Sequence, residues 1–190
     1  MTIGLTGPTG SGKSEISKYL KTKGFFVIDS DEIVRNLYLN CSECIDAVDR
    51  CFSGVLENNV VNKKKLSKIV LNNKDSLLKL CKVVNPYILS QIETEINRNN
   101  CDNIILDAPT LFESEAYKFC DHSLAILSKK QIRLNRILDR DGITYCDAVR
   151  RINMQPNDYF YIKYADEIVF NNSELCDCIN SVECVLHKWS

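Results

Sequence analysis

Short hydrophobic runs recur along this chain, and longer stretches with apolar residues at helical spacing separate them. The runs predict five strands: Thr2–Thr6, Phe25–Ile28, Asn103–Leu106, Ser123–Leu127 and Glu167–Phe170. Strands that alternate with helical stretches are typical of an α/β fold, in which helices cover both faces of a mainly parallel sheet. We therefore expect an α/β sandwich around a five-stranded sheet.

The first strand runs into a Gly-rich loop, and the loop runs into a predicted helix, Lys13–Lys23. Ile16, Tyr19 and Leu20 lie at helical spacing, and Gly24 supplies a C-terminal stop signal. Strand, loop, helix and the following strand together make one βαβ unit.

The helical stretches between the strands divide the chain into regions. A long stretch rich in Leu, Ile, Val, Asn and Lys predicts a mostly helical insert, and a second polar stretch predicts a helical lid. The lysine run Lys63–Lys65 is better explained as the solvated start of a helix than as a binding patch. The expected regions are a core (1–31, 101–128 and 160–190), the insert (32–100) and the lid (129–159).

Composition excludes several classes of protein. A net charge of −1 with a pI near 6.1 argues against a general nucleic-acid binder or a membrane-surface protein. The start of the chain lacks a secretory pattern, and the apolar runs are too short to span a bilayer, so we expect a cytoplasmic protein. The ten cysteines are scattered and the chain has only two histidines, which disfavours a zinc site. We expect reduced thiols that mostly pack as small apolar groups.

The sequence GPTGSGKS, from Gly7 to Ser14, carries the clearest chemical signal. It matches the phosphate-binding pattern G-x-x-x-x-G-K-[ST] at every fixed position, between a strand and a helix as that pattern requires. Backbone amides would surround phosphate oxygens, the Lys13 ammonium would reach the outer phosphates, and the Ser14 hydroxyl would bind Mg²⁺. The residues expected to contact the nucleotide here are Gly7, Gly10, Ser11, Gly12, Lys13, Ser14 and Glu15.

Carboxylates follow two of the predicted strands. Asp29 and Asp31 close the second strand, and Asp107 closes the third. Ligands of open α/β sheets bind at the carboxyl ends of the strands, so one carboxylate could accept a proton and others could orient the water shell of a metal ion. The alternatives are a helix cap for Asp29–Asp31 and an ordinary turn aspartate for Asp107.

The sequence QIRLNRILDRDG places three arginines on one face of a predicted helix: Arg133, Arg136 and Arg140. Guanidinium groups stay charged and suit phosphate oxygens, so a closing arginine lid is one interpretation. A solvated face that pairs with Asp139 and Asp141 is the other.

Several phrases of the sequence resemble the dephospho-coenzyme A kinase family. They are IGLTGPTGSGKS, VIDSDEIVR, NIILDAPTLFES, QIRLNRILDRDG, AVRRINMQ and ADEIVFNN, in the order of the family and across nearly the whole chain. The resemblance implies a nucleotide-binding core, a helical region for coenzyme A and a lid. It also implies ATP-dependent phosphorylation of the ribose 3′-hydroxyl of dephospho-CoA, the last step of coenzyme A biosynthesis, with Mg²⁺.

The resemblance assigns roles to individual positions. Asp31 matches the general base, Lys13 and Ser14 match the phosphate and metal residues, and Arg136 and Arg140 match lid arginines. Asp29 and Asp107 would act on the metal ion through water. The segment of Ala165, Asp166 and Asn171 looks like part of the region near the nucleotide base. We expect a small-molecule acceptor, no nucleic acid or membrane partner, and a monomer or weak homo-oligomer.

One position departs from the family. The helical region reads Asn85-Pro86 where the family usually has His-Pro, and Asn cannot titrate near neutral pH. A binding role could survive that change, whereas proton transfer could not. The rival interpretations are another P-loop kinase of small molecules or nucleoside monophosphates, a nucleotide-dependent switch, and a binding module that has lost catalysis.

Overall fold

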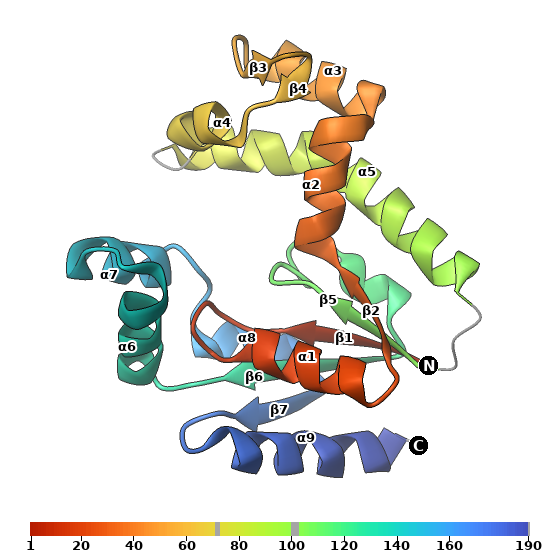
Figure 1. Cartoon of the computed structure of the whole chain (residues 1–190), viewed down its shortest axis with the longest axis vertical. Coiled ribbons are helices and arrows are strands. Elements are labelled where there is room, and N and C mark those ends of the chain that lie inside the picture. The colour runs from red at the N-terminus through yellow and green to blue at the C-terminus, as the bar shows by residue number, and fades with distance from the viewer. Residues whose placement is uncertain (71–72, 100–102, 190) are drawn as a thin grey trace. The chain divides into compact units, whose positions relative to one another are not determined.

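The computed structural model describes residues 1–70, 73–99 and 103–189. The chain divides into two compact units (Figure 1). The first unit comprises Met1–Ile28 and Cys101–Ser190, and the second comprises Asp29–Asn100. The expected lid, 129–159, belongs to the first unit, whereas the expected insert lies in the second.

A five-stranded sheet with strand order β2-β5-β1-β6-β7 forms the centre of the first unit. β1 pairs in parallel with β5 and β6, and β6 pairs in parallel with β7. All five strands lie where the hydrophobic runs predict them, which confirms the expected α/β class. Their bounds are β1 Thr2–Thr6, β2 Phe26–Asp29, β5 Ile104–Asp107, β6 His122–Leu127 and β7 Glu167–Phe170.

Helices cover both faces of this sheet. Ile3 and Leu5 of β1 pack in one cluster with side chains of α1 (Lys13–Thr22) and α9 (Leu175–Trp189). On the opposite face, side chains of β6 pack on Tyr161 of α8 (Asp158–Tyr164). A strand that is buried on both faces is apolar at successive positions, which explains why the runs do not alternate with polar residues.

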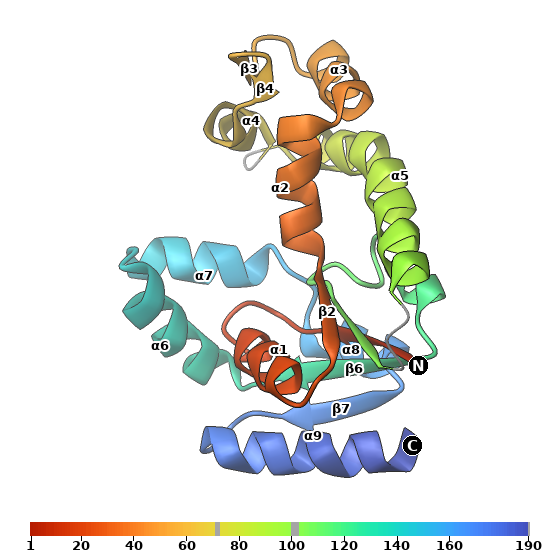
Figure 2. The ribbon, with the colours of Figure 1, turned by 45° about the vertical axis from the view of Figure 1, so that its right-hand side comes forward.

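Two further helices of the first unit, α6 (Lys130–Asp141) and α7 (Tyr145–Asn153), lie side by side outside the sheet (Figure 2). They share a small core of Leu134, Ile137, Ala148 and Ile152. Gly142 ends α6 in the left-handed conformation, with φ of +60°. A short 3₁₀ helix, η1 (Ala116–Phe119), precedes β6.

The second unit is mostly helical, as predicted. Its helices are α2 (Ser30–Asn40), α3 (Ser42–Cys51), α4 (Lys63–Val70) and α5 (Lys74–Arg98). Pro86 lies inside α5, and Figure 1 shows that helix changing direction along its length, as expected where a residue lacks a backbone N–H.

A hairpin in the second unit was not predicted. β3 (Leu56–Glu57) and β4 (Val60–Val61) pair in antiparallel register around Asn58 and Asn59. Both asparagines have a positive φ, at +51° and +62°. Asparagine tolerates this conformation, which the tightest hairpin turns require.

The cysteines pack less than expected. The nine described cysteines are free thiols, but only Cys44 and Cys178 are buried, and four are exposed. Burial raises the pKa of Cys120 to about 12, so that side chain remains a neutral thiol. Cys101 lies outside the described residues.

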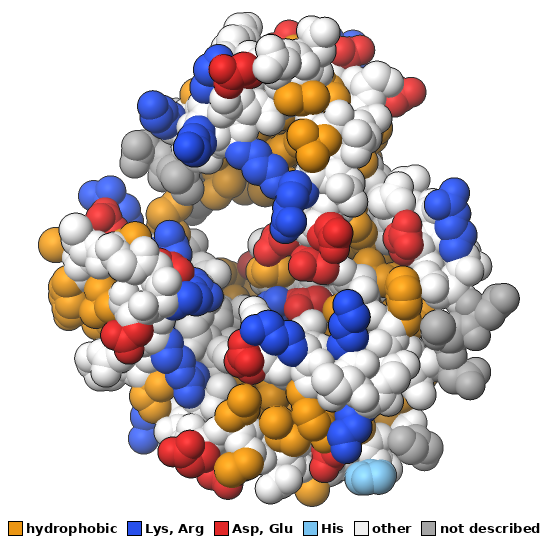
Figure 3. All heavy atoms as spheres, in the orientation of Figure 1, with side chains coloured by type: hydrophobic (Ala, Val, Ile, Leu, Met, Phe, Trp, Pro, Cys, Tyr) orange, Lys and Arg blue, Asp and Glu red, His pale blue; other side chains and the backbone are white. Residues whose placement is uncertain are grey.

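The described surface carries charges of both signs. Lys and Arg side chains alternate with Asp and Glu side chains over the face shown in Figure 3. Within the described residues, no helix is long and apolar enough to cross a membrane.

Candidate active site

The Gly-rich loop joins the carboxyl end of β1 to the start of α1, as predicted. The Ser11 amide donates to the Pro8 carbonyl at 3.1 Å, and the amides of Glu15 and Ile16 donate to the Gly12 carbonyl. The loop therefore runs directly into the N-terminus of α1, and a helix N-terminus favours an anion.

Two residues that follow other strands of the sheet form hydrogen bonds to the backbone of the loop. Arg136 of α6 donates to the carbonyls of Gly10 and Ser11, each at 3.3 Å. Asn171, which follows β7, donates to the Ser11 carbonyl at 2.8 Å and accepts from Arg136 at 3.4 Å. Both residues were predicted to bind the nucleotide, and the contacts observed here are with the backbone of the loop.

Gly12 is one position where the loop has no room for a side chain as the surrounding residues stand. Its φ is +95°, and a Cβ atom there would lie 2.1 Å from Nδ2 of Asn171. A real Cβ cannot approach another heavy atom so closely. The contact explains why the loop needs glycine at this point.

We expect Gly12→Ala to destabilise the protein by more than the roughly 1–3 kcal/mol of a strained backbone conformation, because Asn171 must also move. Unfolding in denaturant measures this change. Gly24→Ala is the matched control, since Gly24 has φ of +91° with no atom within 4 Å of its added Cβ. Equal losses in the two variants would show that the collision with Asn171 costs nothing.

Lys13 and Asp107 lie together. The Lys13 ammonium forms an ion pair with Oδ1 of Asp107, and both side chains are nearly buried. Asp107 is the last residue of β5 and is 8% exposed, so it is not an ordinary turn aspartate. The sequence placed both residues at one edge of the sheet but did not predict the pair.

A further contact with the loop was not foreseen. The Thr9 amide donates to Oε1 of Gln155, at 2.8 Å. Gln155 lies between α7 and α8 and is the last residue of the phrase AVRRINMQ, for which the sequence predicted no separate role. A polar side chain beside Pro156, outside any helix, is the only local signal that could have drawn attention to it.

The three arginines expected to form a row have different surroundings. Arg136 contacts the loop, as described above. Arg133 is 5% exposed and lies 3.8 Å from Asp158. Arg140 is exposed and binds Asp141 through two hydrogen bonds, at 2.7 and 3.0 Å. The hydrogen bond from Arg140 holds the pKa of Asp141 below its usual range.

Asp166 lies at the opposite edge of the sheet from the loop. Its carboxylate accepts from the Ser123 amide and hydroxyl, both at 2.7 Å. These residues precede β7 and open β6, so they belong to the amino ends of the strands, whereas Asn171 follows the carboxyl end of β7. In the late segment that we expected near the nucleotide, Asn171 contacts the loop. Asp166 instead links the start of β7 to the start of β6.

In the second unit, Asp29 caps α2. Its Oδ1 accepts from the amides of Asp31 and Glu32, at 2.8 and 3.3 Å. The cap interpretation is thus correct for Asp29 but not for Asp31, which lies in the first turn of the helix. This leaves the Asp31 side chain outside the capping role.

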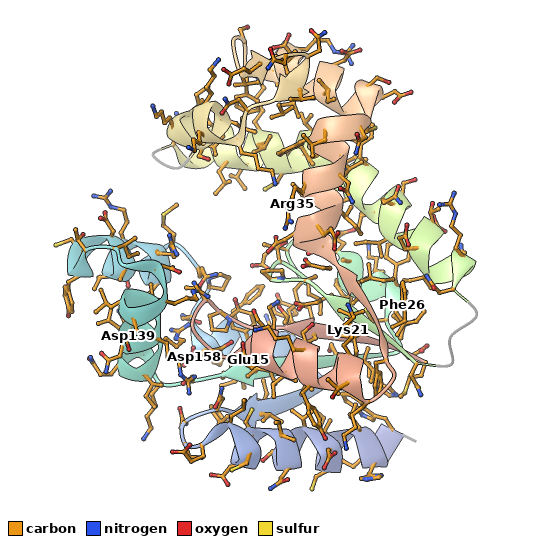
Figure 4. The ribbon with its side chains drawn as sticks, viewed as in Figure 1. Glu15, Lys21, Phe26, Arg35, Asp139 and Asp158 are labelled. Atoms are coloured by element: carbon orange, nitrogen blue, oxygen red, sulfur yellow. The ribbon has the colours of Figure 1, made fainter. Side chains whose placement is uncertain are left out.

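Cations lie near Asp31 within the second unit. Arg35 projects from α2 one turn further on (Figure 4), and the Lys63 ammonium lies 5.7 Å from the centre of the Tyr38 ring. Burial and the charge of Arg35 lower the pKa of Lys63, while Asp31 raises it. Lys63 starts α4 and the three lysines of the Lys63–Lys65 run are exposed, as predicted.

A family model described as dephospho-CoA kinase matches residues 1–177. The chain belongs to the dephospho-CoA kinase family. A dephospho-CoA kinase of Fusobacterium nucleatum subsp. nucleatum is 38% identical over 185 residues, which cover 96% of this chain and 95% of the relative. One of Carboxydothermus hydrogenoformans is 30% identical over 192 residues, with 98% and 93% covered.

Solved structures agree with this membership. The dephospho-CoA kinase from Campylobacter jejuni has a TM-score of 0.70 at 25% identity, covering 100% of this chain and 96% of that one. A shikimate kinase from Acinetobacter baumannii has a TM-score of 0.58 at 14% identity, covering 97% and 90%, and shows a shared fold. The resemblance found in the sequence is confirmed, and the chain is a kinase of the dephospho-CoA kinase family.

Proposed function

We propose that this chain transfers the γ-phosphate of ATP to the ribose 3′-hydroxyl of dephospho-CoA, through the residues named below. The observation that carries the proposal is the phosphate loop with the Lys13–Asp107 pair beside it, in a chain of this family. Phosphoryl transfer depends on positioning and charge neutralisation more than on covalent chemistry, and the loop offers both.

On the nucleotide side, Lys13 would neutralise charge on the outer phosphates, and the amides at the start of α1 would bind their oxygens. Arg136 and Asn171 would support this by fixing the loop carbonyls away from the phosphates. Arg140 would exchange Asp141 for a phosphate oxygen. Exposed ion pairs contribute little stability, so this exchange would cost little.

The residues present fit Mg²⁺. This ion takes oxygen ligands and keeps several waters, so one hydroxyl and the phosphates are enough. Ser14 is exposed at the start of α1, and Asp107 has one oxygen on Lys13 and a second left for a bound water. Asp29, whose Oδ1 caps α2, would act through water as well. Bound Mg²⁺ neutralises charge on the transferred group.

On the acceptor side, Asp31 would accept the proton of the 3′-hydroxyl as the bond to phosphorus forms. Asn85, a half-buried residue of α5, would then contribute binding without proton transfer. We also propose that the enzyme works in the cytoplasm as a monomer or weak homo-oligomer, without nucleic-acid or membrane partners.

ADP release from ATP and Mg²⁺, measured with and without dephospho-CoA, tests the proposal. We expect release that depends on the acceptor. Release that ignores dephospho-CoA would point to a nucleotide-dependent switch, and release that depends on a nucleoside monophosphate would point to another small-molecule kinase.

A further inference from the structure

Arg133 is a buried cation whose hydrogen bonds are incomplete. Its side chain is 5% exposed, and its Nε and Nη1 atoms have no acceptor among the described residues. Its Nη2 lies 3.8 Å from Oδ1 of Asp158, too far for a hydrogen bond, and that oxygen has no hydrogen-bond partner in the described part of the chain either. A buried charge in such a state is costly, so it needs a reason.

Arg133 also contacts the phosphate loop through its backbone. A Cβ atom added to Gly10 would lie 2.8 Å from the Arg133 carbonyl oxygen and 3.0 Å from its Cα. The loop therefore rests on α6 at this residue. Contacts that hold Arg133 in place therefore also hold the backbone on which Gly10 packs.

The side chain of Arg133 reaches the segment that carries Gln155. Both residues line a cavity of about 550 Å³, together with Lys130, Ile152, Asn153, Pro156, Asn157 and Asp158. Asn157 caps α8 by accepting from the Phe160 amide at 3.1 Å, which fixes the position of Asp158 in the first turn. Figure 4 shows Asp158 beside α6.

Three side chains thus connect α6, the segment before α8 and the loop. Asp158 faces Arg133 of α6, and Gln155, three residues earlier, holds the Thr9 amide of the loop. A hydrogen bond to the Thr9 amide fixes the orientation of the Pro8–Thr9 peptide, one residue before Gly10, which has φ of +77°. The loop conformation therefore depends on where residues 155–158 lie.

We propose that Arg133, Gln155 and Asp158 form a loop clamp, whose role is to position the phosphate loop for ATP. The Arg133–Asp158 pair holds the start of α8 against α6, and Gln155 transmits that position to Thr9. All three are positioning residues, because they act on the loop and not on the reacting atoms. The proposal rests on ATP being the ligand of the loop.

The test measures ATP affinity and turnover separately. Gln155→Met keeps the length of the side chain but removes the acceptor for the Thr9 amide. Arg133→Met with Asp158→Leu removes the buried cation and its half-exposed partner together, so neither charge is left unpaired, and the melting temperature should stay close to that of the wild type. In both proteins we expect the Kd for ATP to rise about two- to tenfold, the effect of losing an ordinary hydrogen bond, while kcat at saturating ATP stays unchanged.

The control is the exposed pair of Lys188 and Glu167, which are 2.8 Å apart, replaced together by glutamine. The variant with glutamine at both positions should bind ATP with the Kd of the wild type. Unchanged ATP affinity in Gln155→Met or in the Arg133–Asp158 double variant would overturn the clamp, and so would an equal loss in the control. If the wild type itself showed no acceptor-dependent ADP release, the proposed function would fail, whereas a failed clamp would leave the wild-type activity intact.

Discussion

Lys13→Met should abolish detectable phosphoryl transfer. The substitution removes the one charge that the loop itself places at the start of α1, where the phosphates would bind. It also leaves Asp107, which is 8% exposed, without its cation. A buried carboxylate beside the phosphates would then repel them, so the expected loss exceeds the roughly 10²- to 10³-fold effect of removing one electrostatic donor.

A double variant separates chemistry from folding in this experiment. Lys13→Met alone should lower the stability of the protein, because it leaves a buried charge unpaired. Lys13→Met with Asp107→Asn removes both charges and should recover much of that stability while remaining inactive. Acceptor-dependent ADP release and thermal unfolding are the two measurements. A near-normal rate in either variant would count against the whole assignment of the loop.

The strands and the loop were predictable because their signals are local. Each strand is a short apolar run that is buried on both faces of the sheet, and GPTGSGKS must lie between a strand and a helix to have its pattern. The hairpin at Asn58 and Asn59 also had a local signal, two adjacent residues that tolerate positive φ. It was missed because two-residue strands are too short to show alternation.

The contacts that complete the site were not predictable from local patterns. Gln155 binds an amide 146 positions away along the chain, and Asn171 binds a carbonyl 160 positions away. The rule that ligands bind at the carboxyl ends of strands places Asp107 and Asn171 at the correct edge, but it says nothing of their partners. Helical periodicity has the same limit. Arg133 and Arg140 share a face, yet seven residues of helix span about 10 Å, so each meets a different neighbour.

Asp31→Asn should lower turnover by about 10²-fold or more, the usual scale for loss of a general base. Asparagine has the same size and can still form hydrogen bonds, but it cannot accept the proton of the 3′-hydroxyl. The fold should tolerate the change, because Asp29 and not Asp31 supplies the cap of α2. The KM for ATP should stay the same, since the base acts on the acceptor.

Glu32→Gln is the matched control for Asp31→Asn. Glu32 is the next residue, is also exposed in the first turn of α2, and its loss removes the same charge. Unchanged turnover in Asp31→Asn would remove that residue from the role of base. An equal fall in Glu32→Gln would assign the effect to negative charge at the start of α2 and not to proton transfer.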